Sequence, residues 1–266
     1  TALSEPGVRE MAIIDPQGLL TPLEKGWSVE IWMANSSKVI SPSQLKSITQ
    51  SFDPQKKELS THYSLNEIKL EQQSIFSVLS GSQQALFNKV TVQNTSSTAL
   101  KLSLLLAIRP YNPEGVSPIH DLSYLTNNAM IVNRKLGIVL DQKPSNVVCL
   151  NHEDGDISNC YGKWEMILSR HCKKGMGSSY IEYHLEIPAN ETKTISFKLP
   201  TNAKGQLSKL GSKILPPLQK KQLDDHIELL SKKTFDSIQQ QILQKNTLPQ
   251  ENITDVQLPD IKLTNL

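Results

Sequence analysis

Alternation of apolar and polar residues dominates the chain from about residue 5 to residue 205. In residues 27–31, tryptophan, valine and isoleucine alternate with serine and glutamate, which is the period of two that a half-buried strand gives. Trp32 breaks the alternation, so we expect both faces of the sheet to be covered at that point. Further strands are expected in residues 61–70, 73–79, 86–92, 101–109, 129–132, 136–140, 146–150, 180–187 and 194–199.

Two pairs of these segments are separated by short polar turns, which predicts two β-hairpins. Residues 94–97 (Asn-Thr-Ser-Ser) separate the strands at 86–92 and 101–109, and residues 188–191 (Pro-Ala-Asn-Glu) separate those at 180–187 and 194–199. The strand at 101–109 is apolar on both of its faces, because Leu105 and Ala107 oppose the even-numbered leucines and Ile108. It is therefore expected to lie between two covering layers.

The period changes after residue 216. Apolar residues then recur at helical spacing, and charged residues and glutamines fill the opposite face, which predicts one or two helices between Pro216 and Leu243. Pro216 and Pro217 precede the pattern, where proline is well tolerated at a helix start. The expected fold is therefore mainly β, a large antiparallel two-sheet sandwich in residues 1–205 followed by linker helices in residues 206–266. The apolar positions of the helices are Leu223, Ile227, Leu230, Phe235, Ile238 and Ile242.

Composition narrows the possible partners. The 266 residues carry a net charge of +2, and no run of about 18 apolar residues is present. We expect neither nucleic acid nor a membrane as a partner, because the first needs a strong basic field. The three cysteines match no zinc signature, and we expect them to be reduced and structural in a cytoplasmic protein. No cofactor motif was found, so no cofactor is expected.

One part of the sequence resembles a known family. Residues 90–96 read VTVQNTS and residues 102–119 read LSLLLAIRPYNPEGVSPI. They resemble the N-terminal β-sandwich of bacterial glycogen-debranching-like (amylo-α-1,6-glucosidase-like) proteins, a supersandwich similar to that of galactose mutarotase. The resemblance continues more weakly through residues 130–134, the acidic loop at 153–156 and the Leu-Pro-Asp sequence at 258–260.

The resemblance implies a function. In that family the sandwich precedes an (α/α)6 barrel that holds the catalytic carboxylates, so no catalytic residue can be assigned in this chain. The chain would be a non-catalytic accessory domain of an α-glucan-acting glycoside hydrolase, with the barrel as its intramolecular partner and α-glucan as a further one. An independent carbohydrate- or protein-binding sandwich is the alternative. A mutarotase-like enzyme is a third possibility, and it would need a base and an acid from among His62, His184 and Glu182. His184 and Glu182 are two residues apart on one strand, so they point to the same face, and we expect that face to be exposed to solvent.

The candidate contact residues follow the most apolar strand. Arg109, Tyr111 and Asn112 are expected at the rim of the sandwich, facing the barrel or its cleft, and His120 could bind a sugar hydroxyl. The structural alternative for Arg109 is an ion pair with Glu114 or Asp121 that fixes the loop, since arginine is a common structural clamp. Turn capping is the alternative for His120.

Two other groups of residues were considered for binding. Glu153, Asp154 and Asp156 are the densest acidic group, but their order does not match an EF-hand, and a solvated loop without metal is expected. The tryptophans could stack on sugar rings, but core packing is expected because of the apolar area that each buries. They are Trp27, Trp32 and Trp164.

Overall fold

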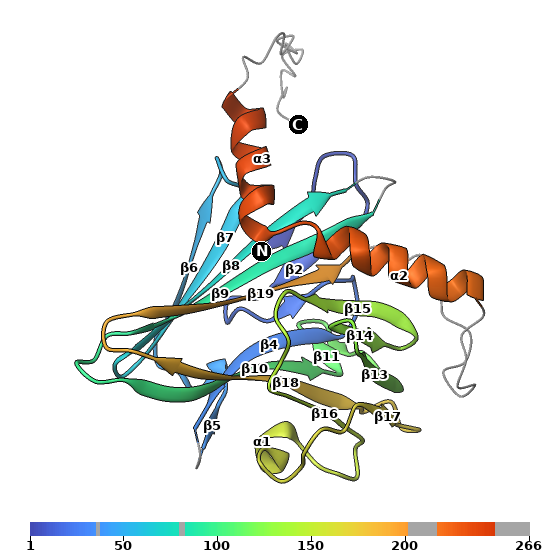
Figure 1. Cartoon of the computed structure of the whole chain (residues 1–266). Coiled ribbons are helices and arrows are strands. Elements are labelled where there is room, and N and C mark those ends of the chain that lie inside the picture. The colour runs from blue at the N-terminus through green and yellow to red at the C-terminus, as the bar shows by residue number, and fades with distance from the viewer. Residues whose placement is uncertain (36–37, 80–82, 202–216, 248–266) are drawn as a thin grey trace, which may run out of the picture.

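Two antiparallel β-sheets packed face to face form the body of the protein (Figure 1). This computed structural model describes residues 1–35, 38–79, 83–201 and 217–247. The predicted mainly β sandwich, followed by helices, is confirmed. No helix in the described ranges has the length and apolar character needed to cross a membrane.

The first sheet, called sheet A here, contains the strand that is apolar on both faces. Its path begins at the N-terminus and ends beside the strand at 178–187, and β5 (Val39–Ile40) pairs with β4 off this path. The strands in order are β1 (Ala2–Leu3), β2 (Ala12–Ile14), β3 (Leu20–Thr21), β4 (Ser28–Ala34), β10 (Leu100–Arg109), β18 (Ser178–Ile187) and β16 (Asn146–Leu150).

The second sheet, sheet B, is larger and contains most of the strands from the middle of the chain. A small hairpin and two short helices lie outside both sheets, the hairpin of β11 (Tyr111–Asn112) with β12 (Gly115–Val116) and the helices η1 (Pro42–Gln44) and α1 (Ile157–Cys160). The strands of sheet B in order are β17 (Ser169–His171), β13 (Asp121–Leu125), β14 (Ala129–Val132), β15 (Lys135–Leu140), β19 (Thr192–Pro200), β9 (Gln84–Asn94), β8 (Ile68–Val78), β7 (Glu58–Leu65) and β6 (Ile48–Asp53).

Strand β10 is covered on both faces, as its sequence predicts. Leu104, Leu106 and Ile108 lie in the main core between the sheets. Leu105 and Ala107 lie in a second apolar cluster on the outer face of sheet A, together with Trp32 and residues of α1. The break in alternation at Trp32 therefore marks a sheet face that a loop covers.

Both predicted hairpins are wrong. Strands β9 and β10 follow one another in sequence but belong to different sheets, and so do β18 and β19. Each backbone already has two other neighbours: β9 pairs with β8 and β19, and β10 pairs with β4 and β18. The polar turns therefore cross from one sheet to the other, and a polar turn alone does not distinguish such a crossing from a hairpin.

Asn94 joins these two crossings. Its Nδ2 donates to the carbonyl oxygens of Thr98 at 2.7 Å, Ile187 at 3.0 Å and Pro188 at 3.1 Å. Its Oδ1 accepts from the Ser96 backbone at 2.9 Å and the Ser96 hydroxyl at 2.8 Å. Because Asn94 is fully buried, these bonds satisfy its own amide away from water and tie it to the backbone of both turns.

Helices α2 (Pro217–Ser231) and α3 (Phe235–Thr247) lie on the outer face of sheet B (Figure 1). All six apolar positions predicted for this segment are buried, in one cluster with residues of sheet B such as Phe87 and Val139. The predicted boundary at residues 205 and 206 falls outside the described residues, and the division into two parts stays a prediction.

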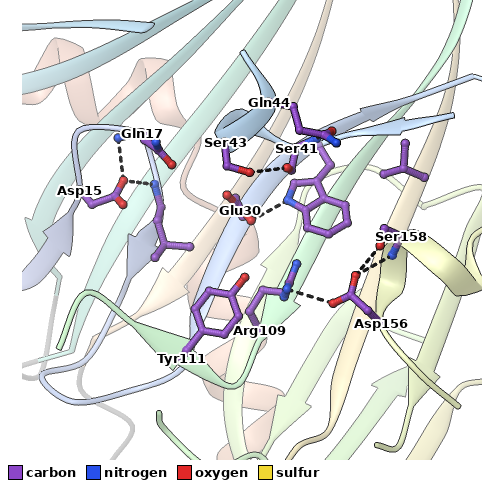
Figure 2. Close-up of a pocket in the computed structure, with 13 residues that line it drawn as sticks. Asp15, Gln17, Glu30, Ser41, Ser43, Gln44, Arg109, Tyr111, Asp156 and Ser158 are labelled. Atoms are coloured by element: carbon purple, nitrogen blue, oxygen red, sulfur yellow. Dashed lines mark hydrogen bonds and ion pairs between the residues drawn. The ribbon is translucent and has the colours of Figure 1, made fainter. Parts of the chain in front are cut away.

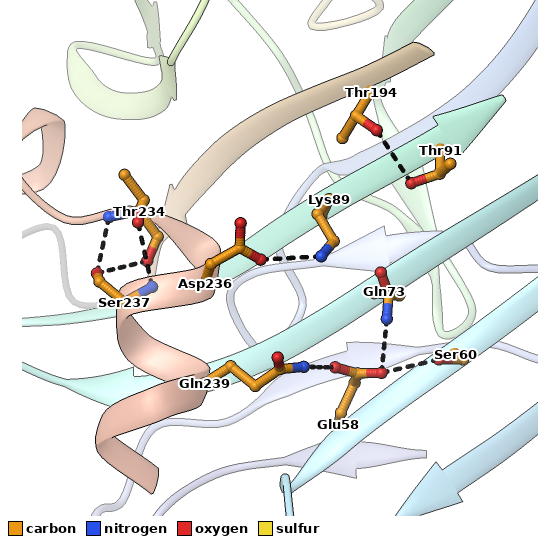
Figure 3. A network of polar contacts seen from close by, with 10 residues as sticks. All are labelled: Glu58, Ser60, Gln73, Lys89, Thr91, Thr194, Thr234, Asp236, Ser237 and Gln239. Atoms are coloured by element: carbon orange, nitrogen blue, oxygen red, sulfur yellow. Dashed lines mark hydrogen bonds and ion pairs between the residues drawn. The ribbon is translucent and has the colours of Figure 1, made fainter. Parts of the chain in front are cut away.

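Polar contacts fix α3 to sheet B (Figure 3). Gln239 Nε2 donates to Glu58 Oε2 at 2.5 Å, and Gln73 Nε2 donates to Glu58 Oε1 at 2.8 Å. Lys89 pairs with Asp236 at 2.9 Å and lies 4.7 Å from the centre of the Phe235 ring. These helices cover sheet B. A polar pocket lies on the outer face of sheet A.

Candidate functional site

A pocket of about 360 Å³ opens on the outer face of sheet A (Figure 2). Its walls come from five parts of the chain: the turn between β2 and β3, strand β4, the region of β5 and η1, the end of β10 with β11, and the start of α1. The lining residues are Asp15, Gln17, Leu19, Glu30, Trp32, Val39, Ser41, Ser43, Gln44, Arg109, Tyr111, Asp156 and Ser158.

Arg109 is clamped at the floor of this pocket. Its guanidinium lies 4.8 Å from the centre of the Trp32 ring and 4.7 Å from that of Tyr111, and it donates to Asp156 Oδ2 at 3.0 Å. The expected partners, Glu114 or Asp121, were wrong, because Asp121 pairs with Arg134 and His171 instead. The fold brings the α1 loop over sheet A and so supplies an acid that is 47 residues away in sequence.

Glu30 is the most buried acid of the pocket, with 8% of its surface exposed. Its Oε2 accepts from the Trp32 indole nitrogen at 2.6 Å, and its Oε1 has no hydrogen-bond partner among the described residues. Burial raises the pKa of Glu30; the Trp32 hydrogen bond and the Arg109 charge oppose that rise, and the charges of Asp15 and Asp156 add to it. Burial likewise raises the pKa of Tyr111 to about 12.

Asp15 belongs to a turn that is held from both sides. Its Oδ1 accepts from the backbone nitrogens of Gln17 at 2.8 Å and Leu19 at 2.9 Å. Gly18 within the turn has φ +85°, and a Cβ there would lie 1.8 Å from the Tyr63 hydroxyl. Sheet B thus approaches the turn so closely that only glycine fits.

Asp156 caps helix α1 as well as pairing with Arg109. Its Oδ1 accepts from the Ser158 backbone at 2.9 Å and the Ser158 hydroxyl at 2.7 Å. Burial would raise the pKa of Asp156, but the Ser158 hydrogen bonds and the Arg109 charge outweigh it and lower the pKa. The segment expected to be a solvated loop therefore holds a short capped helix, and no group of three or more His, Cys, Asp or Glu side chains in the described ranges is placed to hold a metal ion.

Of the four candidate contact residues, Arg109 and Tyr111 line the pocket, and Asn112 and His120 do not. Asn112 donates to the Gly26 carbonyl at 2.6 Å and accepts from the backbone of Glu114 at 2.7 Å, so it holds the β11–β12 hairpin in place. His120 lies just before β13, and its Nδ1 is 3.1 Å from the Cys172 carbonyl oxygen.

Sequence reasoning missed Asp15, Glu30 and Gln17 as pocket residues. The sequence contained a signal for Glu30. Glu30 and Trp32 are two residues apart, so they point to the same face of a strand that was expected to be covered on both faces. A carboxylate on a covered face needs a partner or a cavity. Asp15 and Gln17 gave no signal beyond a turn, since the turn is brought to the pocket by the pairing of β3 with β4 and by hydrogen bonds from Gln50 and Tyr63 of sheet B.

Of the residues considered for a mutarotase-like site, Glu182 and His184 lie together and His62 lies apart from them. His62 lies on β7 in sheet B, and Glu182 and His184 lie on β18 in sheet A. Glu182 was expected to face solvent, but it is buried beneath Tyr161, whose hydroxyl donates to it at 2.7 Å. The Ser103 hydroxyl also donates to Glu182 at 2.7 Å. Glu182 Oε1 lies 3.1 Å from Nε2 of His184.

The tryptophans divide between two environments. Trp27 and Trp32 are buried, as expected. Trp164 is 42% exposed, so its expected place in the core was wrong. It stands in an irregular segment after α1 that meets strand β16 of sheet A through a bridge from Ile167 to Val148 and through hydrogen bonds of Asn146 with Trp164 and Met166.

Comparison with known proteins adds a likeness of shape. No protein-family model matches the chain, and no curated protein matches it. Among solved structures it is similar to a chain titled "Putative kojibiose phosphorylase from human microbiome", with a TM-score of 0.48 and 12% sequence identity. The match covers 83% of this chain but only 28% of that one. An identity this low transfers no function.

Proposed function

We propose that this chain is a non-catalytic N-terminal accessory domain of a bacterial carbohydrate-active enzyme of the glycogen-debranching-like type. In this proposal it packs against an (α/α)6 catalytic barrel and shapes one wall of the cleft. The sequence resemblance at residues 90–119 supports the family, and the mainly β sandwich with helices on its outside is the architecture that the resemblance implies.

One observation carries the proposal of a contact site. Arg109 and Tyr111, which were expected at the rim of the sandwich, line a polar pocket on the outer face of sheet A, whereas α2 and α3 cover the outer face of sheet B. Carboxylates, side-chain amides and an aromatic ring in one concave site are the groups that orient small polar ligands. The three unpaired, buried cysteines support a reducing compartment, and we place the protein in the cytoplasm.

Two measurements test the accessory role. We expect no release of glucose from branched or linear α-glucan by this chain, because the resemblance places the acid and base of the reaction in the barrel; steady release would refute the non-catalytic role. The second measurement is the gene sequence after the codon for Leu266. A coding region of several hundred residues with helical periodicity supports the proposal, and a stop codon at that position contradicts it.

An independent carbohydrate-binding module is the second candidate, and the polar groups that line the pocket favour it. Its test is the binding of maltooligosaccharide to this chain by calorimetry. Binding that Tyr111→Ala abolishes supports the independent module. Binding that is absent here but present when the barrel is attached supports the accessory domain.

A further inference from the structure

The pocket on sheet A has more negatively than positively charged side chains, and a neutral ligand does not require such an excess. Three carboxyl groups line it, those of Asp15, Glu30 and Asp156, against one guanidinium, that of Arg109. Arg109 is already committed to Asp156 at 3.0 Å and to its two aromatic neighbours. Neither Asp15 nor Glu30 forms an ion pair within the described residues, although the Arg109 charge acts on Glu30 and opposes the rise of its pKa.

Glu30 supplies an independent reason to expect a ligand. Its side chain is more than nine-tenths buried, and only one of its two carboxyl oxygens has a partner, the Trp32 indole. The other oxygen, Oε1, faces the pocket (Figure 2). Oε1 is therefore a free acceptor at the pocket surface, where a donor or a cation of a ligand would form a charge-assisted hydrogen bond with it in partly desolvated surroundings.

The shape of the site argues against a metal ion as the missing cation. The described residues include no set of three or more acids, histidines or cysteines that converge as metal ligands do. The pocket volume of about 360 Å³ is at the lower end of the range for small organic ligands. A single organic cation of monosaccharide size fits both facts.

Polar groups that could bind hydroxyls surround the acids. The side-chain amide of Gln17 and the hydroxyl of Tyr111 line the pocket, and the described residues give neither of them a hydrogen-bond partner. Ser41 and Ser43 line the wall near η1, with their hydroxyl oxygens 2.8 Å apart. This arrangement favours a ligand that carries several hydroxyl groups.

We propose that the pocket binds an amino sugar, with its ammonium group between Glu30 and Asp15 and its hydroxyl groups on Gln17, Tyr111 and the serines. The proposal rests on the proposed carbohydrate role and names the ligand class of the same pocket. It goes further because it requires a positive charge on the sugar.

Protonation gives the proposal a second signature. The groups that face Glu30 are Trp32 on its own strand, Arg109 and Tyr111 from β10 and β11, Asp15 from the β2–β3 turn and Asp156 from α1. Burial raises the pKa of Glu30, so its carboxyl group binds a proton more readily than an exposed glutamate does. An ammonium group favours the carboxylate, so binding should release a proton.

The test compares glucosamine with glucose, which differ only in the amino group, by calorimetry at about pH 6, where the glucosamine amine stays protonated. We expect glucosamine to bind about tenfold more tightly, a difference of about 1.4 kcal/mol, with a proton released on binding. Glu30→Gln should remove the preference and the proton release. Glu67→Gln, the same charge change on an exposed turn of sheet B outside the pocket, should change neither.

The other outcomes separate this inference from the proposed function. Equal binding of glucose and glucosamine overturns the amino-sugar inference and leaves the carbohydrate role standing. Binding of Nα-acetyl-lysine amide in place of either sugar shows that the pocket takes a basic side chain of a protein, which also overturns it. If none of the three probes binds, the inference is wrong, and the accessory role is then decided by the glucan assay and the gene sequence alone.

Discussion

The two turns that cross between the sheets depend on one side chain, and replacing Asn94 with alanine tests this. The change removes an amide that donates to the carbonyls of Thr98, Ile187 and Pro188 and accepts from both polar groups of Ser96. The two amide hydrogens and the two accepted bonds amount to four effective hydrogen bonds. At about 1 kcal/mol each, the loss is about 4 kcal/mol.

This loss should appear in the free energy of unfolding measured by urea titration, followed by tryptophan fluorescence. The corresponding fall in melting temperature is roughly 10 °C for a chain of this size. Thr95→Ala is the matched control, because its exposed hydroxyl donates to the Glu67 carbonyl at 2.8 Å and its removal should cost no more than about 0.5 kcal/mol. If Asn94→Ala does not fold well enough to titrate, Ser96→Ala removes one of the same contacts, the hydroxyl bond to Asn94 Oδ1, together with the bond that this hydroxyl accepts from the Thr98 backbone nitrogen, and should cost about 2 kcal/mol.

A loss of less than about 1 kcal/mol for Asn94→Ala, with the control unchanged, would refute the reasoning. It would mean that water or a local shift satisfies the carbonyls of Ile187 and Thr98 at no cost. The crossing of the two turns would then be held by the sheets alone, through the pairings of β9 and β10 with their neighbours.

Three further predictions concern the turn, the pocket and the helices. Gly18→Ala should cost more than about 2 kcal/mol in urea titration, because its Cβ would overlap the Tyr63 hydroxyl, and Gly7→Ala, with a similar φ of +78° and open space, should cost only about 1 kcal/mol; equal costs would contradict the close approach. Because the pKa of Glu30 is higher in the folded protein than its ordinary value of 4.5, the free energy of unfolding should fall as the pH rises from 4.5 through the folded pKa. Glu30→Gln should flatten this fall in urea titrations across the mildly acidic range, and an unchanged slope would contradict it. Phe235→Ala should cost α3 about 3 kcal/mol of docking energy, measured as faster hydrogen exchange in residues 235–247 with the sheet core still protected, and uniform loss of protection across the chain would show that the helix does not detach on its own.

The sequence determined which residues face a core, because burial follows periodicity. The step of two in β10 and the helical step after residue 216 each place their apolar residues correctly, including the second covered face at Leu105 and Ala107. The candidate site was predicted in part. Arg109 and Tyr111 line the pocket, but the other contacts came from turns and loops far away in sequence.

Only the tertiary structure decided which strand pairs with which and what surrounds the pocket. A strand has two edges, and in this sandwich β9 and β10 each use both edges on partners other than the neighbour that follows in sequence. Local patterns contain no information about that competition, so both hairpins were mispredicted. The acids at Asp15 and Asp156 reach Arg109 and Glu30 because a turn and a capped helix from distant segments pack over one sheet face, and long-range packing of that kind has no periodic signature.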